Sequence, residues 1–234
     1  PRTWRRPLLE LYTWTTNNGR KPIVCLEEMG LDYDLHWLDI WKGETRTPEY
    51  VKIHPVGMIP ALVDSDGPGG ESVTVWESIV ILIYLAEKTG MFLPTDAKRR
   101  IEVLEWTLFH GASAAPIFDQ FIHFARDETG ETPDAIIDMV NKKSQRRLAV
   151  YDRCLAERDY LCGAFSIADM ANYPLMVVVN RLGMRFEGYP NLIAWFERMG
   201  ARPGVARGMT IAPEGEEAVP TARGRGSPTI WPVG

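Results

Sequence analysis

Two short stretches of this 234-residue chain combine residue types that could hold a small peptide. The first contains an Ile59-Pro60 bond directly before a short apolar run. If this bond is cis, the backbone N–H and C=O of Ile59 turn outward at the end of a sheet, where an extended peptide can pair with them. An ordinary trans bond, which would leave this position without a binding role, is the alternative.

The second stretch is a Glu77-Ser78 pair directly before a strongly apolar segment, where a helix is expected to begin. A helix N-terminus offers free N–H groups and partial positive charge, which suit a carboxylate ligand. Glu77 could hold an ammonium group beside it. The two stretches together therefore indicate a short peptide ligand with a free amino-acid end. In the alternative interpretation, Ser78 is only the N-cap of the helix.

The elements around these stretches alternate between strand and helix, in the order β-α-β-α-β-β-α. Apolar runs and turn residues predict strands at 8–12, 34–39, 61–63 and 72–76, and helices that end near Gly30, Ile53 and Thr89. This order is typical of a thioredoxin-like domain at 1–90. A linker follows at 91–96.

Strand signals are absent from the pattern after the linker, so the sequence predicts an all-helical domain at 97–211. Its helices are expected at 96–112, 117–127, 134–158, 167–181 and 191–201. Ser166 and Asp169 form a variant capping box, which we interpret as structural. Gly, Pro and charged residues predict a mobile tail at 212–234, and a short basic arm, not a secretion signal, is expected at 1–7.

Val-Gly-Met-Ile-Pro-Ala-Leu (56–62), followed by Trp-Glu-Ser (76–78), resembles the glutathione-binding half of the glutathione S-transferases. Phe-Ser-Ile-Ala-Asp (165–169) is similar to a motif in the helical domain of that superfamily. The Thr-x-Asn-Gly-x-Lys pattern of residues 16–21 resembles the nu class, which is related to the yeast nitrogen-catabolite prion protein. The resemblance implies that glutathione is a cosubstrate held by Ile59, Pro60, Glu77 and Ser78.

The resemblance assigns activation of the glutathione thiol to the Thr16 hydroxyl and to the side chain or N–H of Asn18. A free thiol has a pKa of about 8.5, and lowering it by about two units takes roughly 2.7 kcal/mol. One or two hydrogen bonds to the charged sulfur supply that much, so no metal is required. In the alternative interpretation, Thr16 and Asn18 only cap the helix.

Val56 and Met58 stand where nu-class relatives tend to carry Asn or Lys, so Lys42 is a candidate cation for the glycyl carboxylate. The second substrate is expected to be apolar or planar, in a pocket that includes Trp14, His110, Phe118 and Phe121; the alternative is that these side chains belong to the core. The three cysteines are interpreted as packing residues and not as nucleophiles.

The net charge of −5 argues against nucleic acid as a partner, and no apolar run is long enough to span a membrane. Three cysteines at unrelated spacings indicate a reducing compartment, hence a cytoplasmic protein. We expect a homodimeric glutathione transferase that reduces disulfides or attacks an apolar electrophile. Two alternatives remain: glutathione-dependent cleavage of aryl ethers, and a non-catalytic binding or regulatory protein on the same fold.

Overall fold

The computed structural model describes residues 8–125 and 130–216, which divide into two compact units. Unit one contains residues 8–91 and 203–216, and unit two contains residues 92–125 and 130–202. The predicted arm at 1–7 and the part of the predicted tail from 217 onward lie outside the described residues. In the part of the chain that is described, no helix has the length and apolar character needed to cross a membrane.

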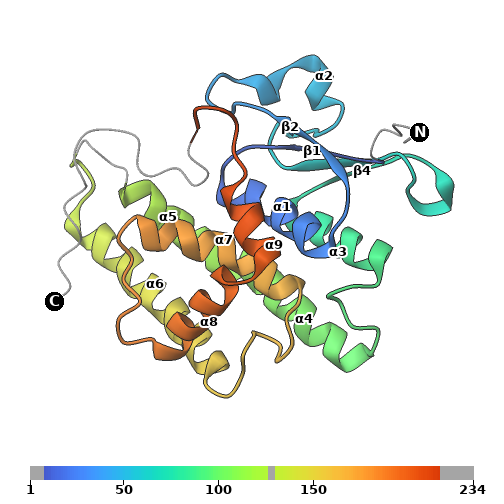
Figure 1. Ribbon diagram of the computed structural model, residues 1–234. Helices are drawn as coiled ribbons and strands as arrows, with labels where there is room; N and C mark the ends of the chain where they lie inside the picture. The colour runs from blue at the N-terminus through green and yellow to red at the C-terminus, as the bar shows by residue number, and fades with distance from the viewer. Residues whose placement is uncertain (1–7, 126–129, 217–234) are drawn as a thin grey trace. The chain divides into compact units, whose positions relative to one another are not determined.

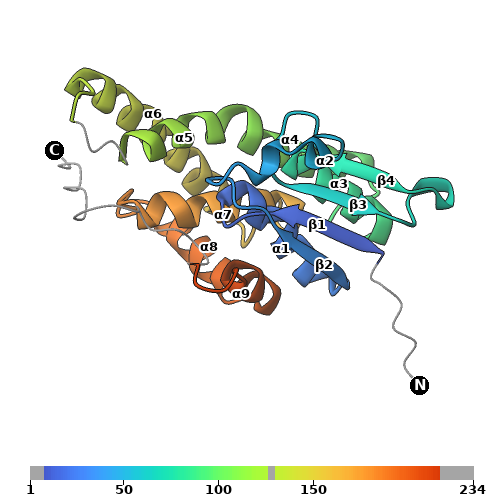
Figure 2. The same ribbon diagram turned by 90° about the horizontal axis from the view of Figure 1, so that it is seen from above.

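Unit one is built on a four-stranded sheet with the order β2-β1-β3-β4, and Figure 2 shows the strands side by side in this order. The strands are β1 (Leu9–Thr13), β2 (Tyr33–Trp37), β3 (Ala61–Asp64) and β4 (Val73–Trp76). β1 and β2 are parallel, whereas β3 is antiparallel to β1 and β4. Alternate residues of β1 are buried, as expected for a strand with helices packed against one face.

Two helices lie on one face of this sheet and a short one lies on the other (Figure 1). They are α1 (Asn17–Met29) and α3 (Ser78–Thr89) on the first face, and α2 (Pro48–Val51) on the second. α1 ends at Gly30, whose φ of 65° is the left-handed conformation that glycine adopts without strain. The element order confirms the predicted thioredoxin-like domain.

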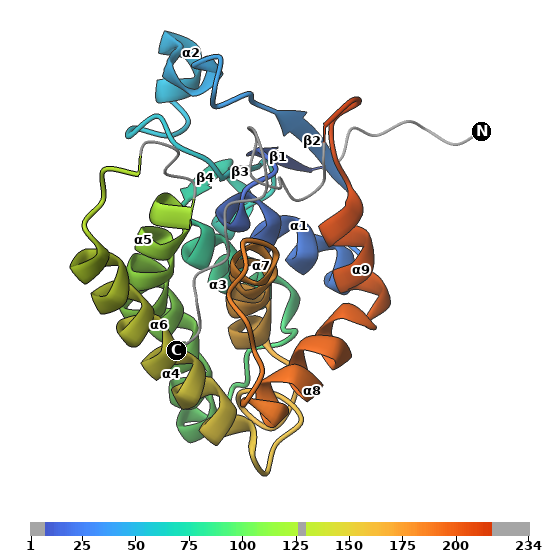
Figure 3. The same cartoon turned by 90° about the vertical axis from the view of Figure 1, so that its left-hand side faces the viewer.

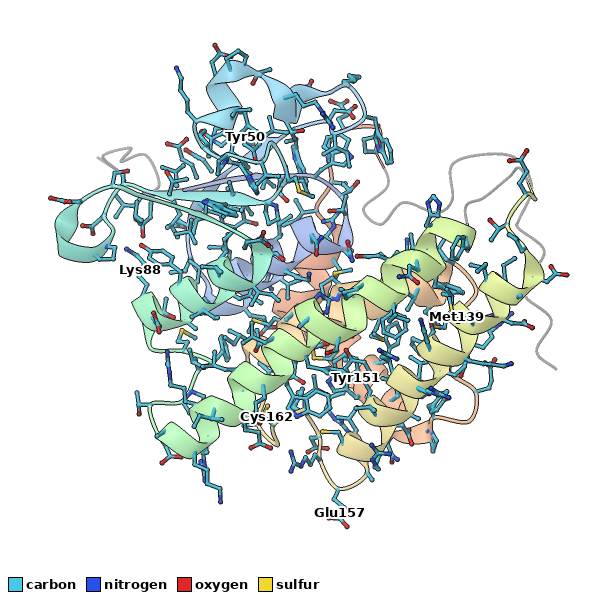
Figure 4. All side chains as sticks on the ribbon, turned by 180° about the vertical axis from the view of Figure 1, so that it is seen from behind. Tyr50, Lys88, Met139, Tyr151, Glu157 and Cys162 are labelled. Atoms are coloured by element: carbon cyan, nitrogen blue, oxygen red, sulfur yellow. The ribbon has the colours of Figure 1, made fainter. Side chains whose placement is uncertain are left out.

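A buried carboxylate fixes α3 to the sheet. Asp64, at the end of β3, is fully buried and accepts hydrogen bonds from the Tyr84 hydroxyl at 2.6 Å and from Lys88 at 2.8 Å. Burial raises the pKa of Asp64, but these two donors and the Asp66 N–H outweigh it, so that its pKa is lowered. Figure 4 labels Lys88 near the end of α3. Because α3 is held at its far end, its first residues are held at the opposite edge of the sheet.

Unit one also contains α9 (Pro203–Thr210), which packs on α1. The sequence pattern predicts no helix here and places these residues in the helical domain. Two glycines permit the contact: a Cβ at Gly204 would lie 2.9 Å from the Glu28 Cα, and one at Gly208 would lie 2.7 Å from the Val24 Cα. Arg20 of α1 donates to the carbonyl oxygens of Gly208 and Ile211. The end of the described chain is thus tied to the helix that begins with Thr16.

Unit two is helical, with α7 in its interior and α4, α5 and α8 packed against it (Figure 3). Its helices are α4 (Ala97–Phe109), α5 (Ala115–Ala125), α6 (Asp134–Leu155), α7 (Ile167–Arg181) and α8 (Pro190–Gly200). A five-residue π-helix, His110–Ala114, joins α4 to α5, where the sequence predicted a plain helix to residue 112. Tyr151 of α6, labelled in Figure 4, packs against Trp106 of α4 and donates a hydrogen bond to Asn172 of α7.

The predicted capping box of α7 is confirmed. The Ser166 side chain accepts from the Ala168 N–H at 3.3 Å, and Asp169 accepts from the Ser166 N–H at 3.0 Å. Asp169 also accepts from the Leu161 N–H at 3.0 Å and from the Trp195 indole at 2.9 Å. Burial raises the pKa of Asp169 to about 6 despite these bonds. The carboxylate joins α7, α8 and the chain before α7, so its role is structural.

Candidate functional site

One edge of the sheet in unit one gathers the predicted site residues. In the strand register Tyr12 pairs with Ala61, and Ala61 pairs with Trp76. The end of β1, the start of β3 and the end of β4 therefore meet at the same edge. The segment that contains Thr16 and Asn18, the Ile59-Pro60 bond and the Glu77-Ser78 pair lie directly beyond these three strand ends. The sheet thus brings the start of α1 close to two stretches that lie more than 40 residues further along the sequence.

The turn between β1 and α1 presents a hydroxyl group. Thr16 is the N-cap of α1, and its Oγ1 accepts a hydrogen bond from the Gly19 N–H at 3.1 Å. Accepting this bond uses a lone pair and leaves the hydroxyl hydrogen available. Within the described residues no acceptor takes that hydrogen. Gly19 is required for the turn, because a Cβ there would lie 2.1 Å from the Trp14 carbonyl oxygen. Capping and donation to a ligand are therefore compatible at Thr16.

Asn18 presents an amide group at the same helix start. Its backbone N–H donates to the Asn17 side chain at 2.8 Å, so only the Asn18 side chain remains from the predicted pair of donors. The Lys21 ammonium donates to the Asn18 Oδ1 at 2.5 Å. Because an ammonium cannot accept, the oxygen must face Lys21 and the Nδ2 must point elsewhere. No residue in the described ranges accepts from that Nδ2.

Lys21 connects α1 to the start of α3. Its side chain is 1% exposed, and its ammonium lies 3.4 Å from the Ser78 hydroxyl as well as beside Asn18. From the sequence, Lys21 was recognised as part of the nu-class pattern but not as a buried contact of Asn18. The available signal was helical spacing, since Val24 and Cys25 lie three and four residues after Lys21 and therefore share its face of the helix, which is buried.

The start of α3 has an unusual backbone. Glu77 occupies the N-cap position with φ 72° and ψ 116°, a conformation that costs about 1–3 kcal/mol in a residue other than glycine. Its side chain is exposed and forms no capping bond, whereas Ser78 is buried in the first turn. Ser78 is therefore not the N-cap, contrary to the structural alternative considered from the sequence. The first N–H groups of α3 face the edge without a side-chain cap.

The segment before β3 is held by two polar contacts. The Tyr50 hydroxyl donates to the Met58 carbonyl at 2.7 Å, and the Val56 N–H donates to His54 Nδ1 at 3.3 Å. Burial of His54 lowers its pKa, which keeps this nitrogen an acceptor. The Ile59-Pro60 bond is cis. In the described part of the chain the Ile59 backbone forms no hydrogen bond, although Pro60 is buried.

Lys42 lies on the surface beyond β2. Its side chain is 75% exposed and pairs with Asp39 at 3.2 Å. Partial burial raises the pKa of Asp39, but hydrogen bonds from the Trp41 N–H, the Lys42 ammonium and the Lys42 N–H outweigh it, so that its pKa is lowered. Val56 and Met58 are exposed by 63% and 57% and offer no charge. Contact of Lys42 with a glycyl carboxylate stays a prediction.

The residues predicted to line a second-substrate pocket are buried. Trp14 of unit one is 6% exposed and packs edge-on against Trp37 at 6.2 Å between ring centroids. His110, Phe118 and Phe121 of unit two are exposed by 2% or less. Their burial is consistent with the core alternative. A shared apolar pocket stays a prediction.

The cysteines do not belong to this edge. Cys25 is fully buried, and burial raises its pKa strongly, which disfavours the thiolate. Burial also raises the pKa of Cys154, and that of Cys162 to about 12. No cluster of His, Cys, Asp and Glu suited to a metal ion occurs in the described ranges. The edge consequently offers hydrogen-bond donors and exposed backbone, but no reactive thiol of its own.

The family of the chain follows from comparison with known proteins. Residues 17–88 match the model of the glutathione S-transferase N-terminal domain, and residues 108–203 match that of the C-terminal domain. The chain therefore belongs to the glutathione S-transferase superfamily, and glutathione is its cosubstrate. This result confirms the predicted family and fold class.

Three relatives illustrate the similarity. Disulfide-bond oxidoreductase YfcG of Escherichia coli is 35% identical over 90% of this chain and 98% of its own length. Protein URE2 of Eremothecium gossypii is 28% identical over 82% of this chain and 64% of its own, which supports the predicted relation to that branch. A glutathione transferase of Pseudomonas putida, solved with one glutathione disulfide per subunit, is 32% identical, covers 90% of this chain and 94% of its own, and has a TM-score of 0.84.

Proposed function

We propose that this protein uses glutathione bound at the edge of the sheet to reduce disulfides. The carrying observation is the pair of donors with no acceptor among the described residues, the Thr16 hydroxyl and the Asn18 amide, beside the unbonded backbone of Ile59. The names of two relatives support the disulfide chemistry, since one is a disulfide-bond oxidoreductase and the other was solved with glutathione disulfide. Membership in the glutathione S-transferase superfamily supports a glutathione-dependent enzyme.

Each part of glutathione has a partner in this proposal. The γ-glutamyl carboxylate meets the first N–H groups of α3 and the Ser78 hydroxyl, and the ammonium meets Glu77. The cysteinyl backbone pairs with Ile59 beside Pro60 as a short added strand. The sulfur then lies at the start of α1, where Thr16 and Asn18 donate to it. Two such charge-assisted bonds suffice to lower the thiol pKa into the neutral range.

The proposed reaction is thiol–disulfide exchange. The glutathione thiolate attacks one sulfur of the disulfide, the old S–S bond breaks, and the leaving thiolate takes up a proton. A second glutathione resolves the mixed disulfide by the same exchange. Two glutathione molecules are thereby oxidised to glutathione disulfide while the substrate is reduced to two thiols. Attack on an apolar electrophile would use the same thiolate, so substrate comparison decides between these chemistries.

The test measures the reduction of bis(2-hydroxyethyl) disulfide by glutathione, with conjugation of 1-chloro-2,4-dinitrobenzene as the comparison. We expect faster disulfide reduction, and a loss of about tenfold in kcat/KM for Thr16→Val, equivalent to one hydrogen bond of about 1.4 kcal/mol. Thr47→Val is the matched control, because Thr47 caps α2 through an equivalent bond to Tyr50 but is exposed away from this edge.

A variant without cysteines separates glutathione chemistry from protein-thiol chemistry. Replacement of Cys25, Cys154 and Cys162 by alanine should leave the activity of the folded protein largely intact. A selective loss of activity in that variant, or full activity in the double variant Thr16→Val, Asn18→Ala, would overturn the proposal. Absence of glutathione binding at millimolar concentration would favour the non-catalytic alternative.

We further propose that the protein is a cytoplasmic homodimer. The free state of all three cysteines supports a reducing compartment. Sedimentation of the purified chain measures the oligomeric state, and the expected mass is twice the 26.5 kDa of one chain.

A further inference from the structure

A buried lysine lies behind the donors of the proposed site. Lys21 is 1% exposed and belongs to α1, yet its ammonium reaches the Asn18 Oδ1 at 2.5 Å and the Ser78 hydroxyl at 3.4 Å. A lysine buried to this degree is rare unless it is paired, because burial of the charge is costly. The contacts with Asn18 and Ser78 therefore offset part of the cost of burying the Lys21 charge at this edge of the sheet.

The contact with Asn18 fixes the amide. Asn18 is only half-buried, and its side chain could otherwise rotate to present either oxygen or nitrogen to a ligand. An oxygen directed at the sulfur would repel a thiolate, whereas the nitrogen donates to it. Lys21 accepts no hydrogen bond, so its presence selects the second orientation. The contact with Ser78 places the same ammonium beside the residue proposed to receive the glutamyl carboxylate.

We infer that Lys21 is a positioning residue for glutathione activation, which holds the Asn18 amide with its nitrogen toward the thiol and supports Ser78 at the carboxylate end. This inference rests on the proposed function. It predicts that one side chain influences both the pKa of the bound thiol and the affinity for the γ-glutamyl group, although it contacts neither directly.

The test compares the pH titration of the thiolate absorbance of bound glutathione in Lys21→Met and in the unaltered protein. We expect the thiol pKa to rise by about one unit and the Kd to weaken about tenfold, each equivalent to one good hydrogen bond. Arg20→Met is the matched control: Arg20 is the neighbouring buried cation of α1, but it donates to the Gly208 and Ile211 carbonyls. The Arg20→Met substitution should lower the free energy of unfolding without changing the thiol pKa of bound glutathione.

A double variant tests whether Lys21 acts through Asn18. In an Asn18→Ala background, Lys21→Met should shift the thiol pKa no further. An additional shift of the same size, or an equal shift with Arg20→Met, would overturn the positioning role. If the unaltered protein itself fails to lower the thiol pKa, the proposed function fails; a lowered pKa that Lys21→Met leaves unchanged defeats this inference alone.

Asn18 variants keep the inference testable if Lys21→Met does not fold. Asn18→Asp retains an oxygen toward Lys21 but cannot donate to the sulfur. We expect it to unfold at the same urea concentration as the unaltered protein or a higher one, and to lose the thiol activation. Asn18→Leu should unfold at a lower urea concentration and should also lose the thiol activation. Equal destabilisation by Asn18→Asp and Asn18→Leu would show that Lys21 does not hold the oxygen of this side chain.

Discussion

α1 and α7 both begin after an N-cap residue with a hydroxyl group, and they differ in which polar groups remain available to a ligand. α7 begins with Ser166, and Asp169 accepts from Ser166, Leu161 and Trp195, so its polar groups are used within unit two. At the start of α1, the Thr16 hydroxyl accepts from one N–H but, among the described residues, donates to no acceptor. A helix start stabilises the fold when its groups are paired internally. It can serve a ligand when donors remain.

The supporting residue also differs between the two starts. Behind the start of α1 lies a cation, Lys21, which orients a neutral amide outward. At the start of α7 the buried group is a carboxylate, which collects donors inward. The contrast separates positions where a substitution should affect stability from positions where it should affect the bound thiol.

The largest loss of stability should come from a substitution at the start of α7, where the polar groups are paired internally. Asp169→Ala leaves the Leu161 N–H, the Ser166 N–H and the Trp195 indole without their acceptor in a buried region. We expect the free energy of unfolding to fall by about 3–5 kcal/mol, measured by urea denaturation.

Asp152→Ala is the control for this variant. Asp152 accepts from the Asn191 and Leu192 N–H groups at the start of α8, but is only half-buried, so a loss of about 1–2 kcal/mol is expected. A larger loss with Asp152→Ala than with Asp169→Ala would contradict the ranking of the two carboxylates.

The pH dependence of stability tests the role of the buried Asp169 carboxyl at the start of α7. Burial raises the pKa of Asp169 from 3.8 to about 6. A raised folded-state pKa means that the folded chain binds the proton more tightly than the unfolded chain. The resulting stabilisation is complete below about pH 4 and is lost as the pH rises through about 6, by about 3 kcal/mol in total. Denaturation of the unaltered protein and of Asp169→Asn at pH 5 and pH 8 measures the change.

Asp169→Asn removes the titrating group and is the reference in that experiment. The difference in unfolding free energy between the two proteins should shrink from pH 5 to pH 8. A difference that grows over this interval would mean that the Asp169 carboxylate is stabilised in its charged form by the donors of Leu161, Ser166 and Trp195.

A paired substitution at the two caps should separate stability from thiol activation. Thr16→Val is expected to raise the thiol pKa of bound glutathione by about one unit, because the hydroxyl donor is lost. Ser166→Ala is expected to lower the free energy of unfolding by about 1 kcal/mol without any change in that pKa. Thiolate absorbance and urea denaturation of both variants test the pair. If neither Thr16→Val nor Asn18→Ala moves the thiol pKa, the donor role passes to backbone groups or to the buried hydroxyl of Thr15.

The smallest effect concerns the glycyl end of glutathione. Exposed Val56 and Met58 provide no cation, and Lys42 is an exposed residue already paired with Asp39. An exposed charge pair is worth only about 0–1 kcal/mol, so γ-glutamylcysteine should bind within about fivefold of glutathione by calorimetry. A hundredfold loss would require a cation that reaches the glycyl carboxylate, and Lys42→Met would then be the first variant to measure.

The sequence by itself determined the local features of this protein. The N-cap at Thr16, the glycine end of α1, the hairpin strands and the capping box at Ser166 each depend on a few consecutive residues whose conformational preferences agree with the fold. The start of a helix at Glu77-Ser78 was also predicted correctly, but the positive φ of Glu77 was not foreseeable, because glutamate rarely adopts it.

Only the tertiary structure decided the contacts between distant segments. α9 is a short helix with two glycines, which disfavour helix in isolation, and it forms because those glycines let it pack closely on α1. Lys21 meets Ser78 across 57 positions of sequence, because the sheet register brings the ends of β1 and β4 to one edge. Burial of a charged side chain depends on what surrounds it in space, and the order of residues alone does not specify that environment.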